Sequence, residues 1–333
     1  MTRSVFPPDG ERVDTHTDLQ NEFISRIAAS GTDRALDWLI PLKNGAELSR
    51  PRPVILSLPS DSEPPYRIEI SESESMSDPL IILSSTAKTE VTNLKVGQKY
   101  YWRVNGAEVR SFTTENNKYR FMDIDGALNV RDIGGINIKQ GLIYRGSEID
   151  KEFHLTEKGK RTFKDELHIK TQLSLRREAI KYLPKPPVAE GINYVVLPYR
   201  PYLEMFEDEH RRELVTIMEF LSDESNYPIY LHCLGGADRT GMIALLLRGL
   251  MGEADEDIIV DYELTSLSSY AMGLAEGVRA LGYRSRSGDY FSDFYKCFCQ
   301  LGGKSIAENT EIFLRECGVE PRVIDRIRAI LSS

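Results

Sequence analysis

One stretch of the chain carries its most specific signal: His232-Cys233-Leu234-Gly235-Gly236-Ala237-Asp238-Arg239-Thr240-Gly241. Residues 228–231 before it form a short apolar run, which is typical of a buried strand. Residues 240–251 after it carry apolar side chains at helical spacing. The stretch is therefore predicted to be a loop that leads from a strand into the N-terminus of a helix.

A loop of this kind is suited to binding a phosphate ester. Backbone N–H groups at a helix N-terminus lack intrahelical partners and lie at the positive end of the helix dipole. Gly235 and Gly236 allow the backbone to curl around an anion, and the planar guanidinium of Arg239 can bind two phosphoryl oxygens. The same positive field stabilises a thiolate, so we expect Cys233 to be a nucleophile that forms a phosphocysteine intermediate.

The other residues of the loop receive supporting roles. Asp238 is the first choice for the general acid, with bracing of the loop or capping of the helix as its alternative role. Asp132 comes second, and the acidic residues that follow Pro201 come third. Thr240 is expected to place its hydroxyl near the sulfur. The predicted substrate-binding residues are His232, Leu234, Gly235, Gly236, Ala237, Thr240, Arg145 and Arg176, with Asn129, Arg131 and Asp132 as structural support for the pocket floor.

The motif resembles the signature of the protein tyrosine phosphatase superfamily, which is His-Cys, five variable residues and Arg-Ser/Thr. Asn129-Val130-Arg131-Asp132-Ile133-Gly134-Gly135 and Gly141-Leu142-Ile143-Tyr144-Arg145-Gly146 narrow this resemblance to the bacterial branch of tyrosine/serine and lipid phosphatases. The resemblance covers about residues 119–333. It implies hydrolysis of phosphate monoesters without a metal or a cofactor. The leading expected substrate is phosphotyrosine in proteins.

Two alternatives stay open at this point. The first is a phosphoinositide or inositol-phosphate phosphatase that uses the same mechanism. Ala237 disfavours it, because lipid-phosphatase relatives often have a lysine at this position to bind highly charged headgroups. The second is a non-catalytic module that only binds phosphate, which the intact pair of Cys233 and Arg239 disfavours.

The second half of the chain has the pattern of an α/β domain. Strand-like runs at 141–144, 169–175, 194–197 and 229–232 alternate with helical runs at 156–167, 206–221 and 240–251. This order predicts a central, largely parallel sheet with flanking helices and the loop at the carboxyl end of a strand.

The first half has a different pattern. Short apolar or alternating runs at 54–58, 66–70, 80–83, 89–91, 99–104 and 109–113 predict an all-β sandwich. Residues 94–104 resemble the corner of fibronectin type III domains, in which the hydroxyl of a tyrosine such as Tyr100 binds backbone. The predicted domains are a helical or irregular segment at 1–44, with short helices within 15–40, a fibronectin type III-like sandwich at 45–115 and the phosphatase domain at 119–333.

The composition limits the partners. The chain has 333 residues, of which 41% are hydrophobic and 28% charged, and its net charge of -9 disfavours nucleic acid. Its four cysteines are too few and too unevenly placed for a disulfide framework or a four-ligand zinc site in a chain of this length. We expect phosphorylated protein or a small phosphate ester as substrate, no insertion into a membrane, and the sandwich as a surface for a protein partner. The expected location is cytoplasmic, or exported if a leader has been removed.

Overall fold

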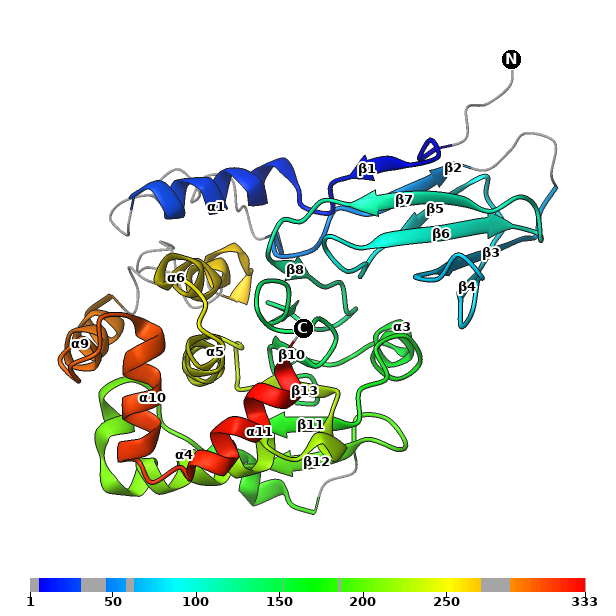
Figure 1. The fold of residues 1–333 in the computed structure, drawn as a ribbon. Coiled ribbons are helices and arrows are strands. Elements are labelled where there is room, and N and C mark those ends of the chain that lie inside the picture. The colour runs from blue at the N-terminus through cyan, green and yellow to red at the C-terminus, as the bar shows by residue number, and fades with distance from the viewer. Residues whose placement is uncertain are drawn as a thin grey trace.

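The chain is represented by a computed structural model, and its described residues are 6–30, 46–57, 63–151, 153–184, 187–270 and 288–332. Figure 1 shows two parts, one made of the N-terminal strands and the other of helices around a second sheet. The helix α1 (Asp18–Ser30) lies beside the helical part although it precedes nearly all the strands in the chain.

The N-terminal part contains seven strands in two sheets. A five-stranded sheet has the order β1-β7-β6-β3-β4, and β2 pairs with β5. Leu56, Trp102 and Phe112 are among the residues that form one apolar core from both sheets. The six runs expected from the sequence match β2 to β7 within one residue at each end. The bounds are β1 (Glu11–Val13), β2 (Val54–Ser57), β3 (Tyr66–Ser71), β4 (Leu80–Ser84), β5 (Lys88–Val91), β6 (Lys99–Val104) and β7 (Arg110–Thr114).

Tyr100 fixes the start of β6. Its ring is buried, and its hydroxyl accepts a hydrogen bond from the backbone N–H of Lys95 at 2.8 Å. This is the kind of contact that the resemblance to fibronectin type III domains implies, although membership of that class stays a prediction. The strand β1 was not expected. It pairs in parallel with β7, with Glu11 opposite Phe112, so residues before 45 also belong to the sheet.

The helix α1 joins the N-terminal segment to the second half of the chain. Phe23 and Ile27 share one helical face and pack into an apolar cluster with Phe121, Val260 and Leu264. The described residues 6–30 are therefore divided between the two parts, because β1 lies in the first sheet and α1 packs on the second half of the chain. The second short helix expected at 35–40 lies outside the described residues.

The second half is built on a six-stranded sheet of order β12-β11-β13-β10-β9-β8. Strands β12, β11, β13 and β10 are parallel to one another. At one edge β9 pairs antiparallel with β10, and β8 pairs antiparallel with β9. This confirms the expected α/β architecture with a largely parallel sheet. The strand bounds are β8 (Arg120–Phe121), β9 (Arg131–Asp132), β10 (Ile143–Gly146), β11 (Thr171–Ser174), β12 (Asn193–Val196) and β13 (Ile229–His232).

Helices cover both faces of this sheet (Figure 1). Because side chains alternate along a strand, Ile229 and Leu231 of β13 face the large cluster formed by α4, α5, α10 and α11, while Tyr230 faces Phe163 on the other side. The bounds are α3 (Glu157–Arg161), η1 (Thr162–Glu166), η2 (Arg177–Tyr182), η3 (Tyr202–Phe206), α4 (Asp208–Leu221), η4 (Glu224–Asn226), α5 (Asp238–Leu250), α6 (Asp255–Glu263), η5 (Leu264–Leu267), α9 (Gly288–Cys299), α10 (Ile306–Glu316) and α11 (Pro321–Leu331).

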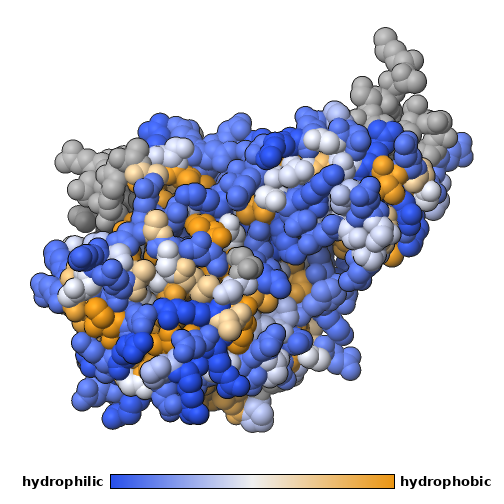
Figure 2. Space-filling model, viewed as in Figure 1, coloured by the Kyte–Doolittle hydropathy of each residue, from blue (hydrophilic) through white to orange (hydrophobic). Residues whose placement is uncertain are grey.

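The surface carries scattered apolar groups. On the face of the molecule seen in Figure 2, hydrophilic residues dominate and the hydrophobic ones form small separate groups. Among the described residues, no helix combines the length and the apolar character that crossing a bilayer requires.

Candidate active site

The predicted phosphate-binding loop connects the central strand β13 to the N-terminus of α5. Cys233 directly follows the strand and is only 2% exposed. Gly236 adopts a φ of +65°, and a Cβ at this position would lie 2.4 Å from the backbone of Gly146. A residue with a side chain would therefore be strained here and would also clash with β10. The glycine lets the loop pack directly on the neighbouring strand and turn back toward the helix.

Asn129 holds this loop through hydrogen bonds to its backbone. Its side-chain amide donates to the carbonyl oxygens of Gly235 and Gly236 at 3.0 and 3.3 Å. Its own carbonyl oxygen accepts from Arg131 at 2.7 Å. Each of these carbonyl groups shares a peptide plane with the N–H group of the next residue. Fixing the carbonyls therefore also fixes the direction of those N–H groups, which is what an anion site of backbone amides requires.

A buried charge cluster supports Asn129. Asp261 of α6 accepts from Arg131 at 2.9 Å and from Arg145 at 2.6 Å, and Arg248 lies 3.5 Å away. Burial opposes ionisation of Asp261, yet the three guanidinium groups together hold the pKa of its carboxyl well below its ordinary value. This carboxylate therefore stays charged and joins α6 to the strands beneath the loop.

Arg239 lies in the first turn of α5, and its side chain is 21% exposed. Its guanidinium contacts the carbonyl oxygen of Leu175 at 3.4 Å and the carboxylate of Glu178 at 3.5 Å. Burial opposes ionisation of Glu178, but its own backbone N–H, Arg239 and Arg176 lower its pKa to about 2. Glu178 is thus a charged partner that orients Arg239.

Asp238 is partly buried and accepts a hydrogen bond from the hydroxyl of Tyr202 at 2.5 Å. That hydroxyl also lies 2.7 Å from the hydroxyl of Tyr262. Tyr202 comes from η3, 36 residues before Asp238 in the chain. The candidate acid is therefore held in place by a side chain that the sequence pattern did not single out.

His232 and Thr240 flank the loop. Nδ1 of His232 lies 3.0 Å from the carbonyl oxygen of Cys233, which can only accept, so Nδ1 carries the hydrogen. Nε2 then accepts from Gln172 at 3.1 Å. The hydroxyl of Thr240 is buried and has no hydrogen-bond partner among the residues that the structure describes.

Comparison with known proteins now places the chain. The model of the tyrosine phosphatase family matches residues 122–332, well over half of the chain. The chain belongs to the tyrosine phosphatase family. Because this family uses a cysteine-based mechanism, the protein is a phosphoric monoester hydrolase. The expected family is confirmed at this level, and the bacterial branch stays a prediction.

Solved structures resemble the phosphatase only distantly. The core catalytic domain of the PP-IP phosphatase Siw14 from S. cerevisiae, in complex with citrate, is 20% identical in a match that covers 50% of this chain and 91% of that one, with a TM-score of 0.28. OH1, a tyrosine phosphatase from the Orf virus, is 14% identical over 55% and 86% of the two chains, with a TM-score of 0.21. No curated protein matches the phosphatase. These values carry no argument about its substrate.

The geometry of the phosphatase corrects two sequence-based expectations. Arg145 is completely buried, and its guanidinium bonds to Asp261 and to the carbonyl oxygen of Gly236 at 2.9 Å. It therefore supports the loop from behind and does not contact substrate. Asp132 is equally buried and pairs with Arg120 at 2.9 Å. Its burial and its ion pair argue against Asp132 as the general acid and favour the structural role.

Arg176 is only 7% exposed. It lies 3.8 Å from the carboxylate of Glu148 and 3.3 Å from that of Glu178. Arg176 and Arg239 thus share Glu178, which lies in η2 shortly after β11. Of the acidic residues after Pro201, Glu204 lies in η3, whereas Glu207 precedes α4 and Asp208 and Glu209 form its first turn. Glu209 pairs with Arg177 at 3.2 Å.

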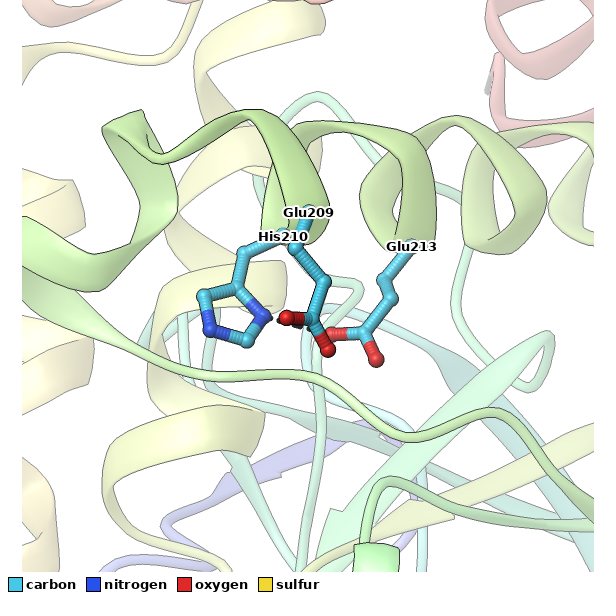
Figure 3. Close-up of side chains that lie close together, drawn as sticks. All are labelled: Glu209, His210 and Glu213. Atoms are coloured by element: carbon cyan, nitrogen blue, oxygen red, sulfur yellow. Dashed lines mark hydrogen bonds and ion pairs between the residues drawn. The ribbon is translucent and has the colours of Figure 1, made fainter.

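One group of potential metal ligands occurs among the described residues, and it lies on α4. Glu209, His210 and Glu213 point to one place on the helix (Figure 3). Arg177 donates to both carboxylates, with Glu213 at 2.5 Å, and His210 bonds to Glu213 at 2.8 Å. The carboxylates are therefore already paired with a cation of the protein.

A cleft of about 1070 Å³ separates the N-terminal strands from the catalytic sheet. Its wall includes Leu142 and Pro228, which directly precede β10 and β13. Cys233 follows the other end of β13. Since the strand lies between them, this cleft is distinct from the phosphate-binding loop.

Proposed function

We propose that the phosphatase hydrolyses phosphotyrosine in proteins through a phosphocysteine on Cys233. The observation that carries this proposal is the position of Cys233 between the carboxyl end of β13 and the N-terminus of α5, with Arg239 in the first turn of that helix. The loop amides and Arg239 form a site for the three non-bridging oxygens of a phosphate ester.

The first step transfers the phosphoryl group to sulfur. The Cys233 thiolate attacks phosphorus, the S–P bond forms and the P–O bond to the leaving group breaks. Asp238 donates its proton to the leaving oxygen, so that tyrosine departs as a neutral phenol. Arg239 and the loop amides stabilise the negative charge of the phosphoryl oxygens in the transition state.

The second step regenerates the free enzyme. Asp238, now a carboxylate, accepts a proton from a water molecule that attacks the phosphorus of phosphocysteine. The S–P bond breaks, inorganic phosphate leaves and Cys233 is again a thiolate. The buried hydroxyl of Thr240 donates to the departing sulfur.

Two features support phosphotyrosine as the substrate. Cys233 is only 2% exposed, and a long aromatic ester reaches a buried sulfur more readily than phosphoserine does. Ala237 adds no charge to the loop for a polyphosphorylated headgroup. A protein substrate also gives the N-terminal strands a role as a second surface for the partner.

The test is release of phosphate from a generic aryl phosphate by the wild type and by Cys233→Ser. We expect the variant to lose turnover while still binding vanadate, because the loop amides and Arg239 are intact. Undiminished turnover by the variant would exclude the mechanism. Failure of the wild type to turn over any ester would favour a module that only binds phosphate.

The substrate class needs a second measurement. Rates on phosphotyrosine peptides, phosphoserine peptides and inositol phosphates are compared under one set of conditions. We expect kcat/KM to be highest for the phosphotyrosine peptides. A clear preference for inositol phosphates would replace this substrate while leaving the cysteine mechanism intact.

A further inference from the structure

A carboxylate from outside the segment matched by the family model lies against the active-site region. Glu47 belongs to residues 46–50, which run along the catalytic half after α1. One oxygen of Glu47 accepts from the backbone N–H and the hydroxyl of Ser269 at 2.8 and 2.7 Å, and from the hydroxyl of Ser268 at 3.1 Å. The other accepts from the hydroxyl of Ser49 and makes a longer contact of 3.4 Å to the backbone N–H of Asn129.

The two groups that Glu47 contacts, Asn129 and the turn at Ser268–Ser269, are each packed against or bonded to the phosphate-binding loop. Asn129 has a left-handed φ of +57° and holds the carbonyl oxygens of Gly235 and Gly236. The turn at Ser268–Ser269 places Tyr270 so close to Gly235 that a Cβ there would lie 2.0 Å from the ring. The side chain of Asn129 also bonds to Thr265 at 3.2 Å, at the start of the same turn. Glu47 therefore contacts both structures that enclose the loop.

The segment that carries Glu47 is itself fixed. The side chain of Gln20 in α1 donates to the carbonyl oxygens of Leu48 and Arg50 at 2.9 and 2.7 Å. The backbone N–H of Leu48 donates to the carbonyl oxygen of Leu267 at 3.0 Å. These bonds hold Glu47 against the turn, so its carboxylate has a defined position.

From this arrangement we infer that Glu47 is a positioning residue of the active site. It fixes Asn129 and the turn at Ser268–Ser269, and through them the direction of the loop amides. This role deepens the proposed function and rests on it, because the amides matter for catalysis only if the loop binds the reacting phosphoryl group. The N-terminal part is then a component of the catalytic machinery and more than an attached module.

The test compares Glu47→Gln with the control Glu69→Gln. Glu69 is another carboxylate of the N-terminal part, and it is paired with Arg67 and Arg103 in the five-stranded sheet. We expect Glu47→Gln to lower kcat about tenfold, less than the ~10²-fold that loss of a direct transition-state donor costs. KM should change less than threefold, because Glu47 does not touch Arg239. A purely structural role would lower the melting temperature of both variants and leave kcat at a low temperature unchanged.

A readout without turnover separates this inference from the proposed function. Amide hydrogen exchange of peptides covering residues 232–241 and 264–270 should be faster in Glu47→Gln and unchanged in Glu69→Gln. If the wild type fails to hydrolyse esters, the proposed function fails whatever the exchange data show. Unchanged exchange in both peptides would overturn the inference even if the enzyme is active.

A double-mutant cycle with Asn129→Ala tests whether Glu47 acts through Asn129. If Glu47 acts through Asn129, the losses in kcat of the two single variants should not add in the double variant. Strictly additive losses would overturn the route through Asn129.

Discussion

The hydroxyl of Tyr202 donates to the carboxylate of Asp238 across 2.5 Å. Since the single hydroxyl hydrogen of Tyr202 is used in this bond, Tyr262 is the donor in the 2.7 Å contact between the two phenols. Burial, with help from Tyr262 and Asp238, raises the pKa of Tyr202 far above its ordinary value. Tyr202 therefore stays a donor at any working pH. Its left-handed φ of +64° is unusual for a non-glycine residue, and this conformation accompanies the contact with Asp238.

Tyr202→Phe removes this bond without changing the size of the ring. If Asp238 is the general acid, kcat/KM should fall about tenfold for aryl phosphates with poorly acidic phenols, a part of the ~10²–10⁴-fold that general acid catalysis contributes. Esters of strongly acidic phenols need no proton and should be almost unaffected. The measurement is kcat/KM across a series of leaving groups. Tyr227→Phe is the control, because its buried hydroxyl bonds to the carbonyl oxygen of Leu221, away from Asp238. Equal losses across the series would argue against Asp238 as the acid.

Glu178→Gln should change the response of stability to acid. The pKa of Glu178 in the folded protein is about 2, below the ordinary 4.5. Its ionised form is therefore favoured by folding, and the resulting stability is present above pH 4.5 and lost as the pH falls toward 2. Urea denaturation at pH 7, 4 and 3 should show a smaller acid loss in the variant than in the wild type. Parallel curves for the two proteins would contradict this assignment.

Glu178→Gln should also weaken the orientation of Arg239. We expect KM for an aryl phosphate to rise a few-fold, in line with the modest worth of a partly exposed ion pair. The control is Glu209→Gln on α4, which loses an exposed pair with Arg177 of η2. Steady-state kinetics at pH 7 provides the measurement. A KM that rises equally in the control would show a general effect on the fold.

Asp261→Asn should be strongly destabilising. It leaves the buried guanidinium groups of Arg131 and Arg145 without their charged partner, and breaking a buried pair of this kind costs about 3–5 kcal/mol. Urea denaturation at pH 7 measures the loss. Asp257→Asn on the same helix is the control, because it pairs with the exposed Lys118 and should cost much less. Similar losses for both variants would mean that the cluster does not carry the expected energy.

The sequence was sufficient to predict strands and the loop where the residues that mark them lie close together in the chain. Short apolar or alternating runs located β2 to β7, and the run before Cys233 located β13 to within one residue. The loop could be predicted because its cysteine, glycines and arginine lie within ten positions of one another. The roles assigned to Cys233 and Arg239 remain for the proposed experiments to test.

The contacts that the sequence did not reveal join residues that are far apart in the chain. Arg145 looked like a substrate contact because it ends a strand at the edge where the loop lies. Its partner Asp261 follows 116 residues later, and only the fold brings the two together. Glu178 offered a weak local signal, since it comes two residues after Arg176 at the same edge. Glu47 offered none, because nothing in its neighbourhood marks it as close to Asn129.

The packing of α1 has a consequence for how such a protein can evolve. Phe23 and Ile27 cover Phe121 and Val260 of the catalytic half. A genetic recombination that exchanged the N-terminal part for an unrelated domain would uncover this apolar surface and remove Glu47 in the same event. The two halves are therefore expected to be inherited together, and homologues that lack the strands should carry polar residues at the positions of Phe121 and Val260.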